Sequence, residues 1–276
     1  MGKSASDLGF RPVTADTRPL PPPSLWTRYR STTRGLTAVG VFLVVWQIVA
    51  ASRILPPIFF PGPLDVVEAG GELFTSPTIG NDLLVSGREF AIGYLLAAAT
   101  AIPLGLMMGW YPGLRHSLDP FISFLYATPR VVLIPLFIIW FGIGENSKIA
   151  LVFLGAFFSI VISTMAGVRS LDPDLLKVAR SFHATNPQIF RTIALPGSVP
   201  FILTGLRLGT GHALIAVVVG ELLAAQAGIG LRIAIAGATF QTAKVFAGVF
   251  VVASTGVLVT TLLSRFESRF DAWRPR

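Results

Sequence analysis

The sequence predicts an all-α membrane protein whose chain crosses the bilayer six times. Of its 276 residues, 53% are hydrophobic and only 13% are charged, and the mean hydropathy is +0.70. Soluble domains usually contain about 25% charged residues. Apolar runs of about 17 to 25 residues, long enough to cross the hydrocarbon as a helix, recur along the chain. The absence of cysteine excludes a disulfide framework and a thiolate metal site.

Six segments have the length and composition of a membrane span. Two of them are interrupted, because Pro120–Ile143 contains Pro129 and Arg130 and Val199–Val219 contains Arg207. The other four contain no Asp, Glu, Lys or Arg: Leu36–Ser52, Phe90–Trp110, Ile149–Val168 and Val245–Ser264.

The distribution of basic residues predicts that both termini face the cytoplasm. With the N-terminus placed inside, fifteen of the 22 Lys and Arg residues lie in cytoplasmic segments and five in external ones, as the positive-inside rule requires. The expected organisation is a disordered cytoplasmic tail (1–35), a first transmembrane anchor (36–52), a main transmembrane domain (80–265) and a short cytoplasmic tail (266–276). Proline and serine are frequent in the first tail.

The stretch "LDPDLLKVARSFHATNPQIFRTIALPG" (171–197) mixes charged and apolar residues at helical spacing. Asp172 and Pro173 predict a helix start, as cap residue and first helical residue, and Asn186 and Pro187 repeat the signal. Pro196 is expected to end the second helix. The first apolar face comprises Leu175, Leu176, Ala179 and Phe182, and the second Ile189, Phe190 and Ile193.

Both predicted helices contain about ten residues, which is too short to span a membrane, and each needs a surface to cover its apolar face. One interpretation is a hairpin that lies on lipid headgroups. The other is a docking element that inserts into a cytoplasmic protein and transmits force to the neighbouring spans. The segment alone leaves both interpretations open.

This segment resembles the signature loop of the permease subunits of bacterial ATP-binding-cassette importers. The family's loop reads Glu-Ala-Ala, then glycine four residues after the second alanine, then Ile-x-Leu-Pro. The matching positions here are Lys177, Val178, Ala179, His183, Ile193, Leu195 and Pro196. The stretches "LPPIFFPGPLDVV", "GLMMGWYPGLRHSLDPFISFLYATPRVVLIPLFIIWFGIGENSK" and "VVVGELLAAQAGIGLRI" resemble the nitrate, sulfonate and taurine branch. The resemblance covers about residues 54 to 265.

Two residues depart from the family's pattern: Lys177 replaces the usual glutamate and His183 the usual glycine. Histidine tolerates positive φ better than most residues, so we expect the turn between the helices to survive with some strain. Lys177 removes any salt bridge that the glutamate would form with an ATPase. The resemblance assigns ATPase coupling to Lys177, Ala179, Phe182, His183, Phe190, Ile193, Leu195 and Pro196.

The resemblance implies a type I importer permease fold in a bacterial plasma membrane, surrounded by lipid, and a transport role without enzymatic activity. Two permease chains, expected to be a homodimer, would form the pathway, two cytoplasmic ATPase subunits would dock on the loops, and an extracytoplasmic binding protein would deliver the solute. The solute would be a small anion such as nitrate, a sulfonate or taurine, moved by alternating access. No cofactor and no nucleic-acid partner are expected, and ATP hydrolysis belongs to another chain.

Polar residues within the spans are the candidates for specific roles, since a central arginine costs about 2.5–3.5 kcal/mol on insertion scales. Arg130 either guides an anionic solute or, as we favour, caps the broken helix or pairs with Asp119. Arg207 either faces a solute or a partner carboxylate or belongs to an internal ion pair, and Glu221 lies near the outer end. His212 is interpreted as a satisfied polar residue on an inner face.

Small residues at Gly205, Gly209 and Gly211 predict a close helix crossing. The crossing could lie at a dimer interface or within one protomer, and the sequence does not separate these cases.

An ion-coupled secondary transporter is the main alternative, and it requires carboxylates or histidines within spans and repeated halves. The spans as assigned place acids such as Asp119 and Glu221 only near their ends, and no internal repeat is visible. A membrane enzyme is a third class, but paired acids, HExxH and a serine nucleophile elbow are all absent from the sequence. Three scattered histidines do not suggest a metal site.

Overall fold

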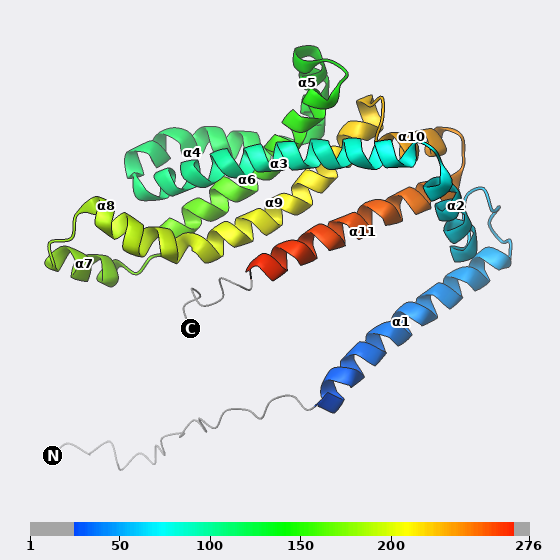
Figure 1. Ribbon diagram of the computed structural model, residues 1–276, viewed down its shortest axis with the longest axis horizontal. Helices are drawn as coiled ribbons and strands as arrows, with labels where there is room; N and C mark the ends of the chain where they lie inside the picture. Colours follow the sequence, from blue (N-terminus) through cyan, green and yellow to red (C-terminus); the bar gives the residue numbers. More distant parts are fainter. Residues whose placement is uncertain (1–24, 268–276) are drawn as a thin grey trace, which may run out of the picture. The chain divides into compact units, whose positions relative to one another are not determined.

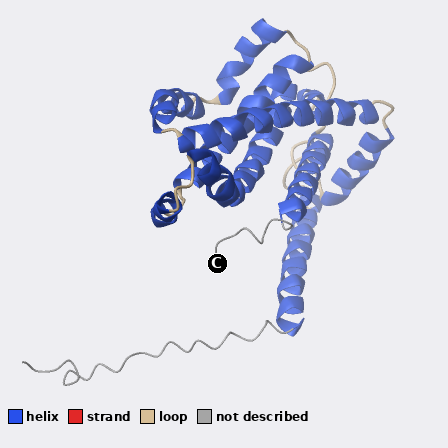
Figure 2. Cartoon of the chain, turned by 60° about the vertical axis from the view of Figure 1, so that its left-hand side comes forward, coloured by secondary structure: helices blue, strands red, loops and turns tan. Residues whose placement is uncertain are grey.

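The computed structural model describes residues 25–267, with side chains for residues 33–265. This described part consists of helices joined by loops and contains no strand (Figure 2). The chain divides between Val49 and Ala50 into two compact units. Nearly all of α1 (Leu25–Ala51) belongs to the first unit, and the remaining helices form the second.

α1 is longer than the predicted anchor. It begins at Leu25, inside the segment 1–35 that was expected to be disordered, and continues through the apolar run to Ala51. The expectation is therefore wrong for the last third of that segment. A helix beginning in polar sequence continues at little cost into an apolar run because each added residue contributes one hydrogen bond. Residues 1–24 and the tail from 268 to 276 lie outside the described residues.

Three long helices form the centre of the second unit: α3 (Ile79–Trp110), α6 (Glu145–Arg169) and α9 (Leu195–Ala224). They run beside one another in Figure 1, and the buried core of the unit is built largely from their facing side chains. α6 is the most enclosed of the candidate spans, since 56% of the residues in its most apolar stretch are buried. Its nearly uniform hydrophobicity is typical of a helix that is covered by neighbours rather than by water.

Glycines bring these helices into backbone contact. A Cβ added at Gly93 or Gly105 of α3 would lie 2.7 Å from atoms of α6, and one added at Gly205 of α9 would lie 2.9 Å from Ser163. Gly209 also faces α6, whereas Gly211 faces open space. The glycines at 205 and 209 thus serve packing within one protomer, because small residues let helix backbones approach closely.

The interrupted span predicted at Pro120–Ile143 is sharply bent. α4 (Pro112–Ala127) is followed by a short 3₁₀ turn, η2 (Arg130–Leu133), and by α5 (Ile134–Phe141), with a bend of 93°. Pro129 lacks the amide hydrogen that would continue the helix, and Thr128 N–H instead bonds to the carbonyl oxygens of Phe124 and Leu125. α4 packs on α3, and α5 packs on α6.

The short helices α2 and α10 lie at one end of the unit, where α11 begins. α2 (Pro63–Thr75) packs on α11 (Thr242–Glu267), and α10 (Ile229–Ala238) contacts both α9 and α11. α7 (Pro173–Ser181) and α8 (Asn186–Ile189) lie at the opposite end, to the left in Figure 1. The two ends of the α3, α6 and α9 bundle therefore carry different structures.

The structure confirms the four clean spans, each of which lies within or overlaps an apolar helix. Within residues 25–267, five helices are long and apolar enough to cross a membrane, and the number rises to six if the bent α4–α5 pair is one crossing. The count of six thus depends on that pair. α3 begins at Ile79, well before the predicted start at Phe90. The predicted start is too late because Glu89 sets the limit of the apolar run.

The glycine contacts generate a prediction with a control in the same helix. Gly105→Ala should lower the free energy of unfolding by ~1–3 kcal/mol, since the added methyl group would overlap Thr164 and the Val161 carbonyl. Gly87→Ala should be neutral or stabilising, because no atom lies within 4 Å of its added Cβ and alanine is the better helix former. Thermal unfolding of both variants in detergent measures the difference. Equal stability of the two would show that α3 and α6 do not approach as closely as described.

Candidate functional site

The hairpin between α6 and α9 begins as predicted. The Asp172 side chain accepts a hydrogen bond from the Asp174 amide at 2.8 Å, and Pro173 occupies the first helical position of α7. At its other end the Ala184 amide bonds to the Ala179 carbonyl and the His183 amide to the Arg180 carbonyl. These two bonds form a Schellman motif, which ends a helix when the residue after the C-cap adopts a left-handed conformation.

His183 is that residue, with φ of 56°. The prediction that histidine would replace glycine in a positive-φ turn is confirmed. Non-glycine residues adopt this region at a cost of about 1–2 kcal/mol, so the turn contains local strain. The motif separates α7 from α8.

The start and end of the second helix differ from the prediction. Thr185, not Asn186, is the cap, and its amide donates to Gln188 Oε1 at 2.7 Å in a capping box. The helix does not stop before Pro196. α8 continues through a π-helical turn (η3, Phe190–Ala194) directly into α9. The wider turn places Pro196 in the first turn of α9, where a missing amide hydrogen costs little.

Several apolar side chains of the hairpin are exposed rather than covered by other residues. Phe182 is 81% exposed, and Leu175 and Val178 of α7 are about half exposed. Phe190 differs, because its ring packs edge-on against Trp110 with centroids 5.4 Å apart. A hollow of about 460 Å³ lies beside α8, lined by Met107, Trp110, Tyr111, Asn186, Pro187, Phe190 and Arg191.

The other residues assigned to coupling lie along the same hairpin. Lys177 is exposed and pairs with Asp174 of its own helix at 2.8 Å. Ala179, Ile193 and Pro196 are half-buried, and Leu195 is 37% exposed. The assigned residues are therefore not one surface: Lys177, Phe182 and His183 are open, whereas Phe190 supports the junction with α3.

A second cluster lies at the opposite end of the bundle, where α10 meets α3. Asp82 of α3 is 2% exposed and accepts hydrogen bonds from the Gly228 amide at 3.0 Å and Arg232 Nε at 2.6 Å. Ser86 lies one turn further along α3, and its hydroxyl accepts from the Ile229 amide at 3.0 Å. Two side chains of α3 thus hold the first turn of α10.

Glu221 completes this connection from α9. Its fully buried carboxylate accepts from Ser86 Oγ at 2.5 Å and from the Gly230 amide at 2.6 Å. A Cβ at Gly228, where φ is 119°, would overlap this carboxylate. Glycine is needed at this position because of both the backbone angle and the close approach.

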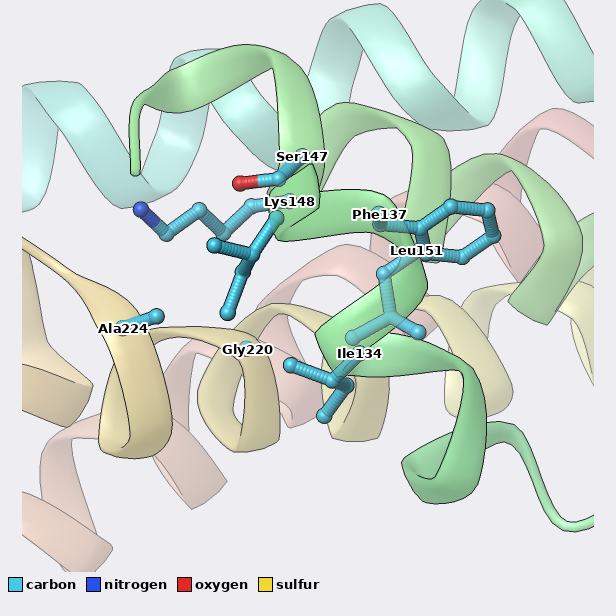
Figure 3. Close-up of a pocket in the computed structure, with 8 residues that line it drawn as sticks. Ile134, Phe137, Ser147, Lys148, Leu151, Gly220 and Ala224 are labelled. Carbon is cyan, nitrogen blue, oxygen red and sulfur yellow. The ribbon is translucent and has the colours of Figure 1, made fainter. Parts of the chain in front are cut away.

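Glu89 and Lys148 extend the cluster toward α6. Glu89 is 1% exposed and its Oε2 has no hydrogen-bond partner among the described residues, while Lys148 is 3% exposed and donates to the Gly144 carbonyl at 3.0 Å. Figure 3 shows the stem of Lys148 passing near Gly220 and Ala224 of α9, in a gap of only about 10 Å³. Long amphipathic side chains bury their stems in this way. The cluster therefore joins α3, α6, α9 and α10.

Arg130 and Arg207 belong to neither cluster. Arg207 is exposed on α9. Arg130 lies in the 3₁₀ turn after α4, where its Nε is buried without a partner among the described residues and its Cζ lies 6.0 Å from the centroid of the Tyr126 ring. The ion pairs of the described residues do not include the expected pairing with Asp119, and Arg130 makes no capping hydrogen bond there.

The sequence matches a family model over residues 101–272, and the family is described as the inner membrane component of binding-protein-dependent transport systems. The chain belongs to this family. It is an inner membrane permease with several spans, and the resemblance stated for its loop is confirmed.

Three curated relatives show the branch to which the permease is similar. It is 35% identical to the taurine transport system permease protein TauC of Escherichia coli (strain K12), covering 90% of this chain and 92% of the relative. It is 34% identical to the putative aliphatic sulfonates transport permease protein SsuC of Bacillus subtilis (strain 168), covering 87% of each chain. It is 32% identical to the nitrate import permease protein NrtB of Synechococcus elongatus, covering 83% and 86%.

A solved structure has the same fold. The permease is similar to a chain of a bacterial ABC transporter involved in the import of the acidic polysaccharide alginate, with a TM-score of 0.60 over 89% of this chain and 96% of that chain. At 18% identity, this likeness concerns the fold alone. It confirms the importer permease architecture.

Most of the cluster at the α10 end was not predicted from the sequence. Because the span was started at Phe90, Asp82 and Glu89 were not treated as residues of a helix, and Lys148 and Arg232 were counted only as external charges. The statement that acids lie only near span ends is therefore wrong for Glu89. A spacing of seven residues between Asp82 and Glu89 places them on one helix face, and this was the available signal.

The strained turn of the permease can be tested at His183. His183→Val should speed amide exchange at residues 183 and 184 about tenfold, since β-branched residues are genuine outliers at positive φ and ~1.4 kcal/mol corresponds to tenfold. His183→Gly should preserve or slow that exchange. Arg180→Val, at a helical position, is the control and should change it far less. The strain at His183 is refuted if the two valine variants exchange alike.

The connection to α10 can be tested with an introduced cysteine, because the chain has none of its own. In an Ile229→Cys background, where the reporter replaces a residue that is 3% exposed, Asp82→Ala should speed maleimide labelling about tenfold or more. Hydrogen bonds to a charged group contribute about 1.5–3 kcal/mol each, and two are lost. Glu72→Ala is the control, since it removes only the exposed pair with Lys244. Equal labelling rates in both variants would contradict the role of Asp82.

Proposed function

We propose that this permease is the membrane-spanning subunit of an ATP-driven importer that moves a small anion into the cytoplasm. The observation that carries the proposal is the α7–α8 hairpin, which exposes Phe182, Leu175 and Val178 at one end of the bundle. A capped and ordered hairpin with an uncovered apolar face fits a protein partner. Because the family includes binding-protein-dependent systems, an ATPase subunit is the partner we propose.

The hairpin is positioned to transmit movement. α7 follows α6 after only three residues, and α8 continues without a break into α9 through the π turn. α6 and α9 in turn share a glycine-lined contact. A force applied at α7 and α8 would therefore move α6 and α9 together, because close-packed interiors transmit displacement rather than absorb it. Closure of an ATPase dimer would be coupled in this way to alternating access.

The proposed orientation places the hairpin and both termini in the cytoplasm and the α10 cluster outside. Fifteen of the 22 basic residues then lie on the cytoplasmic side. An external binding protein would approach from the α10 end. Since the sequence has no phosphate-binding loop, ATP hydrolysis belongs to the ATPase subunits.

A second permease chain is the proposed partner within the membrane. α4, η2 and α5 expose large apolar and aromatic side chains, including Phe121, Phe124, Tyr126, Val132, Ile139 and Trp140. Two such chains would enclose a pathway between them, with lipid around the assembly. The taurine, sulfonate and nitrate relatives support a small oxyanion as solute. A secondary transporter is less consistent with this family.

Co-purification tests the proposal. Tagged permease purified from its native membrane should carry an ATP-binding-cassette ATPase, identified by mass spectrometry. Phe182→Asp should reduce its recovery by about tenfold or more, because burying a phenylalanine contributes about 1.5–3 kcal/mol and a carboxylate opposes burial. Phe190 is unsuitable for this test, since its contact with Trp110 supports the fold.

Phe240→Asp provides the matched control. Phe240 is also an exposed phenylalanine in a turn that follows a helix, 64% exposed and at the α10 end. Its replacement should leave ATPase recovery unchanged. Wild-type permease that is recovered intact without an ATPase, or equal recovery in both variants, would refute the docking role and favour a hairpin that lies on lipid.

A further inference from the structure

Arg130 places a guanidinium within the apolar part of the fold. It lies at the 93° break between α4 and α5, with its Nε buried and without a partner among the described residues. No described carboxylate forms an ion pair with it. A charged arginine inside a membrane seldom faces lipid. Its surroundings in the assembled protein must therefore contain water, a ligand or another chain.

A series of side-chain contacts leads from this arginine through α4 to α6 and α9. Tyr126 of α4 lies beneath the guanidinium, and its ring meets Phe158 of α6 edge-on with centroids 6.4 Å apart. The next residue of α6, Ser159, bonds to His212 Nδ1 of α9 at 2.7 Å. The 3₁₀ turn η2, which contains Arg130, itself packs against both α6 and α9.

His212 offers a second donor, on the helix α9 that η2 contacts. Ser159 is 5% exposed, and its hydroxyl is hydrogen-bonded to one ring nitrogen of His212, Nδ1. No described residue bonds to the other nitrogen, Nε2. When the serine donates to Nδ1, Nε2 carries the hydrogen and is free to donate.

The other membrane acids are poor partners for Arg130, even those of a second copy. Asp82, Glu89 and Glu221 are at most 2% exposed, and Glu145 faces Arg88 at 3.5 Å. Asp119 is the exposed acid that remains among the described span residues. A free anion can approach where these fixed carboxylates cannot.

We infer that Arg130, together with His212 Nε2, binds a compact oxyanion such as a sulfonate, nitrate or carboxylate. The inference deepens the proposed function, on which it rests, by naming the residues of the pathway that recognise the solute. The planar fork of arginine matches such groups in a bidentate geometry. Tyr126 supports the guanidinium face, and Ser159 orients the imidazole.

Equilibrium binding to the purified transporter complex, without binding protein, tests the inference. The probes are methanesulfonate and nitrate, with choline as a cation control, and calorimetry measures the binding of each. Wild type should bind both anions and not choline. Arg130→Gln should weaken anion binding about tenfold or more, since charge-assisted hydrogen bonds are worth ten- to hundredfold in affinity. Arg130→Lys should weaken it less because the charge remains, and His212→Leu should also weaken it.

Two controls distinguish an anion site from a general charge effect and from a contact between two copies of the chain. Arg88→Gln removes an exposed arginine at the α10 end and should leave anion affinity unchanged. If Arg130 instead pairs with Asp119 of a second copy, Asp119→Asn and Arg130→Gln should both reduce dimer recovery, and neither should change anion affinity. That result would overturn the inference, as would wild type that binds neither anion, or Arg130→Gln that binds as well as wild type. Should Arg130→Gln fail to assemble, Arg130→Lys and His212→Leu decide the matter.

The same samples keep this inference distinct from the proposed function. Recovery of the ATPase depends on Phe182 and not on Arg130. Lost anion binding with retained ATPase supports the oxyanion site, and retained binding refutes the site while the importer stands. A wild-type preparation without ATPase refutes the importer whatever the anions do.

Discussion

The close contact of α6 with both α3 and α9 is the constraint on which the rest of the fold depends. In a membrane, lipid covers apolar side chains as well as another helix does, so association relies on packing rather than on exclusion of water. Gly93 and Gly105 on one side of α6, and Gly205 and Gly209 on the other, allow backbone contact. Because α6 is fixed against both neighbours, the hairpin at one end and the polar cluster at the other are attached to one rigid body.

The two ends of this body are built from different interactions, and this suits different tasks. At the α10 end, Asp82, Ser86 and Glu221 supply acceptors and the first turn of α10 supplies amides. Buried polar groups must be satisfied in this way, so this end is held firmly. At the other end, α7 is capped but leaves Phe182 uncovered. One end resists movement and the other is free to receive a partner.

Much of this arrangement could be predicted because it depends on local chemistry. Asp172 and Pro173 are a local helix-start signal, because they precede apolar residues at helical spacing. His183 was expected in a turn with positive φ. Both hold in the structure. Pro196 was interpreted as a helix end for the same kind of reason. That prediction failed because proline is tolerated wherever its missing amide hydrogen is not needed for a helical hydrogen bond. The π turn before Pro196 provides such a position, so the helix continues.

The sequence by itself determined that the chain is a membrane protein, that a short amphipathic hairpin interrupts its spans, and that it resembles an importer permease. These conclusions follow from composition, hydrophobic runs and a motif read along the chain. Only the tertiary structure decided which polar residues meet. Asp82 and Gly228, or Tyr126, Ser159 and His212, are far apart in sequence, and whether they touch depends on how helices rotate and slide against one another. Glycine contacts fix that rotation, and a pattern of hydrophobic residues along one chain does not contain it.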